Sequence, residues 1–273
     1  MSRAGTPGPM FAGSIPEIYD QYFVPLIFEP YAIDLARRLA GLPLTRVLEI
    51  AAGTGALTRQ LATTLPRDVS LLATDLSQAM LDHAAAVGAS RPVEWQQADA
   101  LDLPFDDGSF DAVVCQFSAM FYPDRARAYA EARRVLRRGG LFLFNVWDRI
   151  EDNEFAWLAE QALATLFPED PPRFMSRVPH GYHDTAMIRR DLAKGGFSSD
   201  PRIETVTARS RAAAARVPAI ALCQGSPLRA EIEERDASKL AAATDAAEAA
   251  IAARFGRGPV DGKIQAHVIA VNS

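Results

Sequence analysis

The fold of this chain is decided by the stretch Val47-Leu48-Glu49-Ile50-Ala51-Ala52-Gly53-Thr54-Gly55-Ala56-Leu57-Thr58. An apolar run followed by two glycines and then by helix-forming residues predicts a buried strand, a tight turn and a helix start. Gly53 and Gly55 have no Cβ, so they can adopt positive φ and let a ligand lie against the backbone. Asp75 ends a second apolar strand, and its carboxylate can accept two hydrogen bonds from a ribose. Together these features predict a crevice for a nucleoside-containing cofactor.

Length and composition favour a single domain. The chain has 273 residues, 49% of them hydrophobic, which is enough for one substantial core with helical additions. A net charge of -5 offers little attraction to a phosphate backbone, so we expect no nucleic-acid partner. The apolar runs are shorter than the ~20 residues of a membrane helix, so we expect no membrane insertion.

The cysteines and the N-terminal residues indicate a cytoplasmic protein. Cys115 and Cys223 lie far apart without CxxC spacing, which predicts packed thiols and no disulfide or zinc site. Residues 1–9 lack a basic region followed by an apolar stretch, so they predict a frayed tail and no signal peptide. We expect no metal.

Strand and helix patterns alternate along the first half of the chain. Strands are predicted near 46–51, 69–74, 93–97, 110–115 and 140–147, and helices near 56–65, 77–87 and 124–138. This alternation predicts an α/β fold with a parallel sheet and helices on both faces. Pro123 and Asp124 open the last of these helices, Gly139-Gly140 closes it, and the arginines near its end predict a solvated face.

The pattern changes after Trp147. Helices are predicted over 152–166, 184–195 and 240–255, a proline-rich loop over 168–179, and strands over 202–208 and 264–271. The two strands are separated by helical sequence, which indicates a hairpin whose connection is expanded into a cap.

The glycine turn departs from two common nucleotide-binding patterns. Thr58 stands where the dinucleotide pattern G-x-G-x-x-G has its third glycine, which counts against NAD. No Tyr-x-x-x-Lys occurs in the chain, and no Gly-Lys-Ser/Thr follows the turn as in a P-loop.

A series of motifs in order at the right spacing carries a family resemblance. The motifs are Glu49-x-Ala51-x-Gly53-Thr54-Gly55, Asp75-Leu76-Ser77-x-x-Met80-Leu81, Asp99-Ala100, Leu103-Pro104-Phe105-x-x-x-Ser109-Phe110-Asp111 and Val135-Leu136-Arg137-x-Gly139-Gly140. Over residues 46–147 the chain resembles class I S-adenosylmethionine-dependent methyltransferases, in the branch of the ubiquinone and menaquinone C-methyltransferases. The resemblance implies a Rossmann-like doubly wound, mostly parallel seven-stranded sheet with an antiparallel last strand and helical cap insertions.

The resemblance also assigns the methionine end of S-adenosylmethionine. The backbone at Ala51, Gly53 and Gly55 would face the methionine part, and Glu49 would bind its ammonium group directly or through water. Ala51 replaces a glycine that the family often has. Gln116, leaving the fourth strand, would line the cofactor and substrate pocket.

For the nucleoside end, the resemblance implies that Asp75 binds the ribose, Asp99 the adenine amino group and the Ala100 N–H a ring nitrogen. Leu76, Met80 and Leu101 would sandwich the adenine. Each role has a structural alternative: Asp75 as a helix cap, a task that Ser77 could serve better, Asp99 as a loop residue, and the apolar side chains as core.

The resemblance divides the single methyltransferase domain, 1–273, into three parts. Residues 1–45 would form an N-terminal helical lid, 46–147 the cofactor-binding core, and 148–273 the helical insertions and closing strands of a substrate cap. Tyr19 and Tyr22 would close over the cofactor, or they pack as ordinary helix residues.

Methyl transfer from a sulfonium needs alignment and water exclusion more than a nucleophile, so the resemblance names no catalytic residue. In His180-Gly181-Tyr182-His183-Asp184, His183 is the candidate base, and the alternative is a surface or helix-cap residue. Gln224-Gly225-Ser226-Pro227-Leu228-Arg229 would line the acceptor pocket or form a turn.

The function expected from the resemblance is methylation of a small organic acceptor on oxygen, nitrogen or carbon. One alternative is a cofactor-binding protein without turnover. A nucleic-acid methyltransferase is another, although the chain lacks Asn/Asp-Pro-Pro-Tyr, a Pro-Cys nucleophile and basic charge. A homodimer is one possible oligomeric state.

Overall fold

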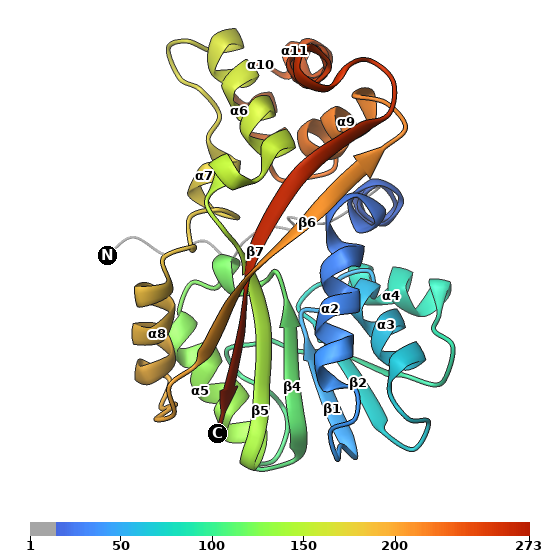
Figure 1. Cartoon of the computed structure of the whole chain (residues 1–273), viewed down its shortest axis with the longest axis vertical. Coiled ribbons are helices and arrows are strands. Elements are labelled where there is room, and N and C mark those ends of the chain that lie inside the picture. The colour runs from blue at the N-terminus through green and yellow to red at the C-terminus, as the bar shows by residue number, and fades with distance from the viewer. Residues whose placement is uncertain (1–14) are drawn as a thin grey trace.

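The structure, a computed structural model, describes residues 15–273 (Figure 1). Within this range seven strands form one sheet in the order β3-β2-β1-β4-β5-β7-β6. The strands are β1 (Arg46–Ile50), β2 (Ser70–Asp75), β3 (Glu94–Gln97), β4 (Phe110–Gln116), β5 (Leu136–Trp147), β6 (Arg202–Ala212) and β7 (Val260–Asn272). The pairs among β1 to β5 are parallel, whereas β7 is antiparallel to both β5 and β6. The predicted Rossmann-like sheet with an antiparallel last strand is confirmed.

Helices cover both faces of the sheet (Figure 1). One side carries α2 (Glu29–Leu39), α3 (Ala56–Thr64) and α4 (Gln78–Val87), and the other carries α5 (Arg125–Val135) and α8 (Thr185–Lys194). Successive side chains of β1 serve the two faces: Val47 joins the apolar cluster under α2 and α3, and Leu48 joins the cluster that includes α5. Because both faces are covered, the central strands are apolar on both sides.

The two strands β6 and β7 continue beyond the rest of the sheet and carry a group of helices above it (Figure 1). These elements are η3 (Ile150–Asp152), α6 (Glu154–Leu166), α7 (Phe174–Arg177), α9 (Arg216–Gln224), α10 (Leu228–Asp236), η4 (Ala237–Lys239) and α11 (Leu240–Phe255). The β6–β7 register is antiparallel from the pair Arg202 and Ala270 to the pair Ala212 and Val260. The predicted hairpin with an expanded connection is therefore confirmed. Both strands are longer than predicted, and the predicted loop at 168–179 contains α7.

One predicted boundary is wrong. The helix expected over 124–138 ends at Val135, and β5 begins at Leu136. Leu136 pairs with Phe110 of β4, and the Arg137 guanidinium lies 2.5 Å from a carboxylate oxygen of Asp111. Pairing of Leu136 with β4 therefore ends the helix earlier than the helical pattern of the arginines predicted. The predicted helix start is confirmed, because the Asp124 carboxylate accepts a hydrogen bond from the N–H of Arg127.

The N-terminal segment is helical from Ile15 onward. It consists of α1 (Ile15–Ile18), the π-helix η1 (Tyr19–Phe28) and α2. Longer π-helices are rare and often mark functional sites. The N–H of Glu29 donates to the carbonyl of Val24, so helical hydrogen bonding continues from η1 into α2, and we call α1, η1 and α2 together the N-terminal rod. The tail predicted over residues 1–9 lies outside the described residues.

Both cysteines are buried free thiols, as predicted. Burial raises the pKa of the Cys115 thiol to about 11 and that of Cys223 to about 12, so neither is a ready nucleophile. Among residues 15–273, none of the helices combines the length and the apolar character needed to cross a membrane.

Candidate active site

The glycine turn after β1 has the backbone that the sequence predicted. Ala51, Gly53 and Gly55 have φ values of 56°, 56° and 84°. A Cβ at Gly55 would lie 3.2 Å from the Trp95 ring and 3.3 Å from Ala84 and Arg59, so this position is crowded as well as left-handed. Ala51 adopts the left-handed conformation without being glycine, which costs about 1–2 kcal/mol. Such strain is commonly found at ligand sites.

Asp75 is tied directly to this turn. One carboxylate oxygen accepts the N–H of Gly53 at 2.8 Å, and the other accepts the N–H of Ser77 at 2.8 Å. Burial raises the Asp75 pKa, and the backbone hydrogen bonds from Ser77 and Gly53 oppose that rise. The side chain of Ser77 caps α4 by accepting from the N–H of Met80. A carboxylate oxygen can accept more than one hydrogen bond, so Asp75 retains capacity for hydroxyl donors.

Glu49 lies at the bottom of the same turn and is only 3% exposed. Its carboxylate accepts the Thr58 hydroxyl at 2.6 Å. Burial raises the Glu49 pKa to about 8, although the Thr58 hydrogen bond works in the opposite direction. The hydroxyl of Thr54, also buried in the turn, has no hydrogen-bond partner among the described residues. A buried acid and an unsatisfied hydroxyl fit a ligand that brings an ammonium group and further polar atoms, as the methionine end of S-adenosylmethionine does.

The nucleoside side of the site follows β2 and β3. The N–H of Ala98 donates to the carbonyl of Asp75 at 3.0 Å, which places the loop after β3 beside the end of β2. In this loop the Asp99 carboxylate accepts the N–H of Leu101 at 2.9 Å, and Ala100 is buried. Of the residues expected to sandwich the adenine, Leu76 is 61% exposed, Leu101 is half-buried and Met80 is buried.

The N-terminal rod contacts the end of β4. Gln116, at the end of β4, donates from its side-chain amide to the carbonyl of Phe28 at 2.8 Å. The Tyr19 ring stacks on Phe28 with 5.1 Å between centroids. Burial and then the nearby Asp75 charge raise the Tyr19 pKa. Tyr22 is half-buried against the core.

The rod is also held by charge. The Asp20 carboxylate lies 3.0 Å from the Arg59 guanidinium on α3 and 3.6 Å from His83 on α4. Asp20 therefore joins the N-terminal segment to both helices that follow the predicted cofactor motifs. We call this set the Asp20 latch.

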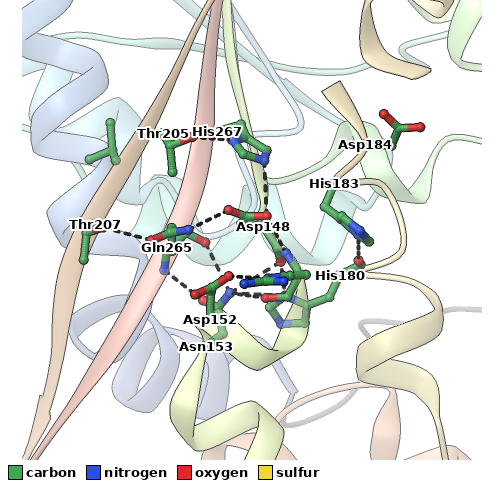
Figure 2. A network of polar contacts seen from close by, with 12 residues as sticks. Asp148, Asp152, Asn153, His180, His183, Asp184, Thr205, Thr207, Gln265 and His267 are labelled. Atoms are coloured by element: carbon green, nitrogen blue, oxygen red, sulfur yellow. Dashed lines mark hydrogen bonds and ion pairs between the residues drawn. The ribbon is translucent and has the colours of Figure 1, made fainter. Parts of the chain in front are cut away.

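The structure places His180 and His183 of the motif at 180–184 in a polar network with Asp148 (Figure 2). His183 contacts the carbonyl of His180 through its Nδ1, at 2.7 Å. The Asp184 carboxylate accepts the N–H of Ala186 and caps α8, as in the helix-cap alternative. Figure 2 shows that the Asp184 carboxylate stands apart from the His183 ring.

The sequence interpretation missed the centre of this network, Asp148. Its carboxylate accepts the side-chain amide of Gln265 at 2.7 Å and lies 3.2 Å from His267 Nε2 (Figure 2). His267 in turn contacts the Thr205 hydroxyl through Nδ1, at 3.0 Å. Asp148 directly follows β5, as Asp75 ends β2, and that position at the sheet edge is the signal that could have identified it.

The predicted segment 224–229 is the turn between α9 and α10. A Cβ on Gly225 would lie 2.9 Å from Ile18 and 3.3 Å from Phe23, so the turn packs closely on the N-terminal rod. The Ser226 hydroxyl donates to the carbonyl of Leu222 at 2.7 Å. This confirms the turn, while its neighbour Leu222 lines a cavity beside Trp147.

Known proteins resemble both the sequence and the fold. The methyltransferase domain family matches residues 48–144. A malonyl-[acyl-carrier protein] O-methyltransferase from Geobacter sulfurreducens is 34% identical over 160 residues, 58% of either chain. The ubiquinone/menaquinone biosynthesis C-methyltransferase UbiE from Idiomarina loihiensis is 34% identical over 121 residues, 43% of this chain and 47% of that one. The chain thus spans about half the length of the curated relatives it matches.

Among solved structures, a phosphoethanolamine N-methyltransferase 2 from Haemonchus contortus, in complex with S-adenosyl-L-methionine, superposes with a TM-score of 0.56. The match covers 94% of this chain and 56% of that chain at 20% identity, so it supports the fold alone. The sequence matches and the glycine turn tied to Asp75 agree. The chain thus contains a methyltransferase domain over residues 48–144 that is similar to the ubiquinone and menaquinone C-methyltransferases, and this domain indicates S-adenosylmethionine as the cofactor.

Proposed function

We propose that this protein transfers a methyl group from S-adenosylmethionine to a small organic acceptor. The observation that carries the proposal is the hydrogen bond from the Gly53 N–H to the Asp75 carboxylate, because it joins the acid after β2 to the strained turn after β1. Glu49, buried below the turn, completes a site with acidic groups at both ends.

Each residue has a defined task in this proposal. S-adenosylmethionine supplies a methyl group on a sulfonium, which needs no enzyme nucleophile. Glu49 would hold the ammonium group, the backbone from Ala51 to Gly55 would bind the methionine part, and Asp75 would accept the ribose hydroxyls. Alignment of this kind can lower the barrier by ~7–11 kcal/mol. Asp99 and the Ala100 N–H would orient the adenine.

Three parts of the chain would divide the work. Residues 46–147 would bind the cofactor, residues up to 45 would form the lid, and residues 148–273 would form the cap over the acceptor. Relatives named for O-methylation and C-methylation support a small acceptor, and the net charge of -5 argues against nucleic acid. The buried free thiols suit a reducing cytoplasm.

Binding of the cofactor tests the site directly. In isothermal titration calorimetry the protein should bind S-adenosylmethionine, and S-adenosylhomocysteine should compete. The substitution Asp75→Ala should weaken binding by about tenfold or more, since a hydrogen bond to a charged group contributes ~1.5–3 kcal/mol. Asp82→Ala is the matched control, because Asp82 is exposed on α4 and its carboxylate accepts from Gln78. Equal affinities of the two variants would remove Asp75 from the site.

Turnover separates the enzyme from a cofactor-binding protein without activity. A panel of small metabolites should be incubated with the protein and methyl-labelled cofactor. Label in an organic product is the expected result. Tight cofactor binding with no labelled product from any metabolite class would favour the binding protein.

A further inference from the structure

A cavity of about 40 Å³ lies between the N-terminal rod, the cap and the sheet. Phe23, Trp147 and Phe155 supply its aromatic walls. The other side chains that line it are apolar, except for those of Asn153 and His180. The volume suits a few water molecules, so a larger occupant requires a shift of η1, which forms one wall.

The cavity adjoins the proposed cofactor site through shared aromatic residues. The ring of Phe23 lies 5.5 Å from that of Tyr19, whose pKa responds to Asp75. The Trp147 ring stacks on Phe117 at 3.7 Å with 7° between the planes, and Phe117 directly follows β4. Two aromatic walls of the cavity, Phe23 and Trp147, therefore contact aromatic residues near the proposed cofactor site, Tyr19 and Phe117.

Asn153 is already engaged in hydrogen bonds through both ends of its amide. Its amide nitrogen donates to the carbonyls of Arg149 and Gln265 at 3.1 and 3.2 Å, and its oxygen accepts the N–H of Gln265 at 3.1 Å. Asn153 thus fastens the start of α6 to β7. Of these two polar side chains, His180 is the one with a ring nitrogen that makes no hydrogen bond within residues 15–273.

His180 is held in one tautomer. It is 4% exposed, and its Nδ1 lies 2.7 Å from the carbonyl of Asp148, which can only accept. Nδ1 therefore carries a proton. Burial lowers the His180 pKa to about 4, so the ring is neutral at pH 7 and Nε2 has a free lone pair. Within residues 15–273, Nε2 makes no hydrogen bond.

The network of Figure 2 fixes this arrangement. The Asp148 carboxylate is anchored by Gln265 and His267, while its backbone carbonyl receives His180. The His180 carbonyl in turn contacts His183. The Asp148 carbonyl therefore orients the ring, as a preorganised binding group requires, whereas His183 contacts the main chain of His180.

We propose that this cavity receives the methyl acceptor and that the acceptor is an aromatic molecule whose hydroxyl donates a hydrogen bond to His180 Nε2. This inference rests on the proposed methyltransferase function. Aromatic walls favour a ring. A neutral acceptor nitrogen suits an O–H group, which brings one donor. A carboxylate would meet no cation among the residues that line the cavity.

Binding of two probes of equal size tests the proposal. Phenol and toluene should be titrated into the protein saturated with S-adenosylhomocysteine, with Trp fluorescence and ligand-detected NMR as readouts. The wild-type protein should prefer phenol by about tenfold, the size of one hydrogen bond. His180→Leu should bind toluene and lose the preference, and His180→Gln, which keeps an acceptor, should retain part of it. His183→Gln is the matched control and should behave as wild type.

Several results would overturn the inference. A phenol preference that persists in His180→Leu would exclude His180, and wild-type protein that binds neither probe would exclude the cavity. Circular dichroism and S-adenosylhomocysteine affinity identify a misfolded His180→Leu, in which case His180→Gln decides. If the wild-type protein binds phenol but not S-adenosylhomocysteine, the proposed function fails while the cavity assignment stands.

Discussion

At the scale of single residues, the proposed cofactor site contains two carboxyls that are largely withdrawn from water, those of Glu49 and Asp75. Glu49 is buried with a hydroxyl partner in Thr58, and Asp75 takes backbone N–H groups from two directions. Both carboxyls have raised pKa values because burial removes water from them. In the proposed function, a ligand that brings an ammonium group to Glu49 would offset that cost and would gain affinity from it.

Glu49 should therefore make stability depend on pH. Its pKa is about 8 in the folded protein and 4.5 ordinarily. Between these values the folded state holds a proton that the unfolded state releases, so the stabilisation is complete below 4.5 and is lost as pH rises through 8. The glutamine of Glu49→Gln does not titrate. The free energy of unfolding of this variant minus that of the wild type should therefore increase between pH 5 and pH 9 by an amount on the order of 4 kcal/mol.

Urea unfolding at pH 5, 7 and 9 measures this difference. His180 also makes stability depend on pH, because its pKa is about 4 in the folded protein and 6.5 ordinarily, so it destabilises the fold as pH falls below 6.5. This contribution is the same in the variant and the wild type, so it cancels when the two are compared at equal pH. Glu94→Gln, which changes an exposed carboxyl on β3, is the control. If the free energy of unfolding of Glu49→Gln changes with pH just as that of the wild type does, the Glu49 carboxyl is solvated in the folded protein. The same variant should also bind S-adenosylmethionine more weakly.

At the scale of elements, an ion-pair cluster joins the N-terminal rod to α3 and α4. This cluster is the Asp20 latch, and a partly exposed ion pair contributes about 1 kcal/mol or less. Asp20→Ala should therefore leave global stability nearly unchanged. It should increase amide hydrogen exchange over 19–28 and, if the rod covers the cofactor as proposed, speed the release of S-adenosylhomocysteine several-fold.

The ion pair of Asp34 with Arg38 provides the matched control for the latch. It lies within the same rod, on α2, at 2.7 Å, and it makes no link to α3 or α4. Stopped-flow release should be unchanged in Asp34→Ala. Equal release rates for the Asp20 and Asp34 variants would show that the rod does not limit exit of the product.

The sequence predicts the strands and helices more fully than it predicts the residues of the candidate site. The strand and helix periodicity and the glycines at 53 and 55 are local signals, so the sheet, the turn and the hairpin could be predicted. The end of α5 at Val135 depended on pairing with β4, a non-local contact. The Asp148 network joins residues more than a hundred positions apart, such as Asp148 with Gln265. No local pattern reports such a contact, and for that reason the sequence singled out His183 and passed over His180.

At the scale of the whole molecule, the cap and the sheet share one apolar core. The same cluster runs from Leu48 of β1 through Trp147 to Ile251 of α11. The strands β6 and β7 belong to both parts (Figure 1). The N-terminal rod adds a further link, since the Tyr31 hydroxyl donates to the carbonyl of Val206 at 3.1 Å. The cap is thus built as a continuation of the sheet.

We therefore expect the cap and the sheet to unfold in a single transition. Trp95 lies in the sheet and Trp157 on cap helix α6, so their fluorescence reports on the two parts separately. Both test variants carry Trp147→Phe. In one variant Trp157 is also replaced by Phe, and in the other Trp95 is, so that each keeps a single tryptophan. Their fluorescence transitions in urea should coincide. S-adenosylhomocysteine at about 100 times its Kd should raise the free energy of unfolding by about 2.7 kcal/mol in both. An earlier transition for Trp157, or a ligand shift confined to Trp95, would show that the cap folds separately and that its cavity can open without loss of the cofactor site.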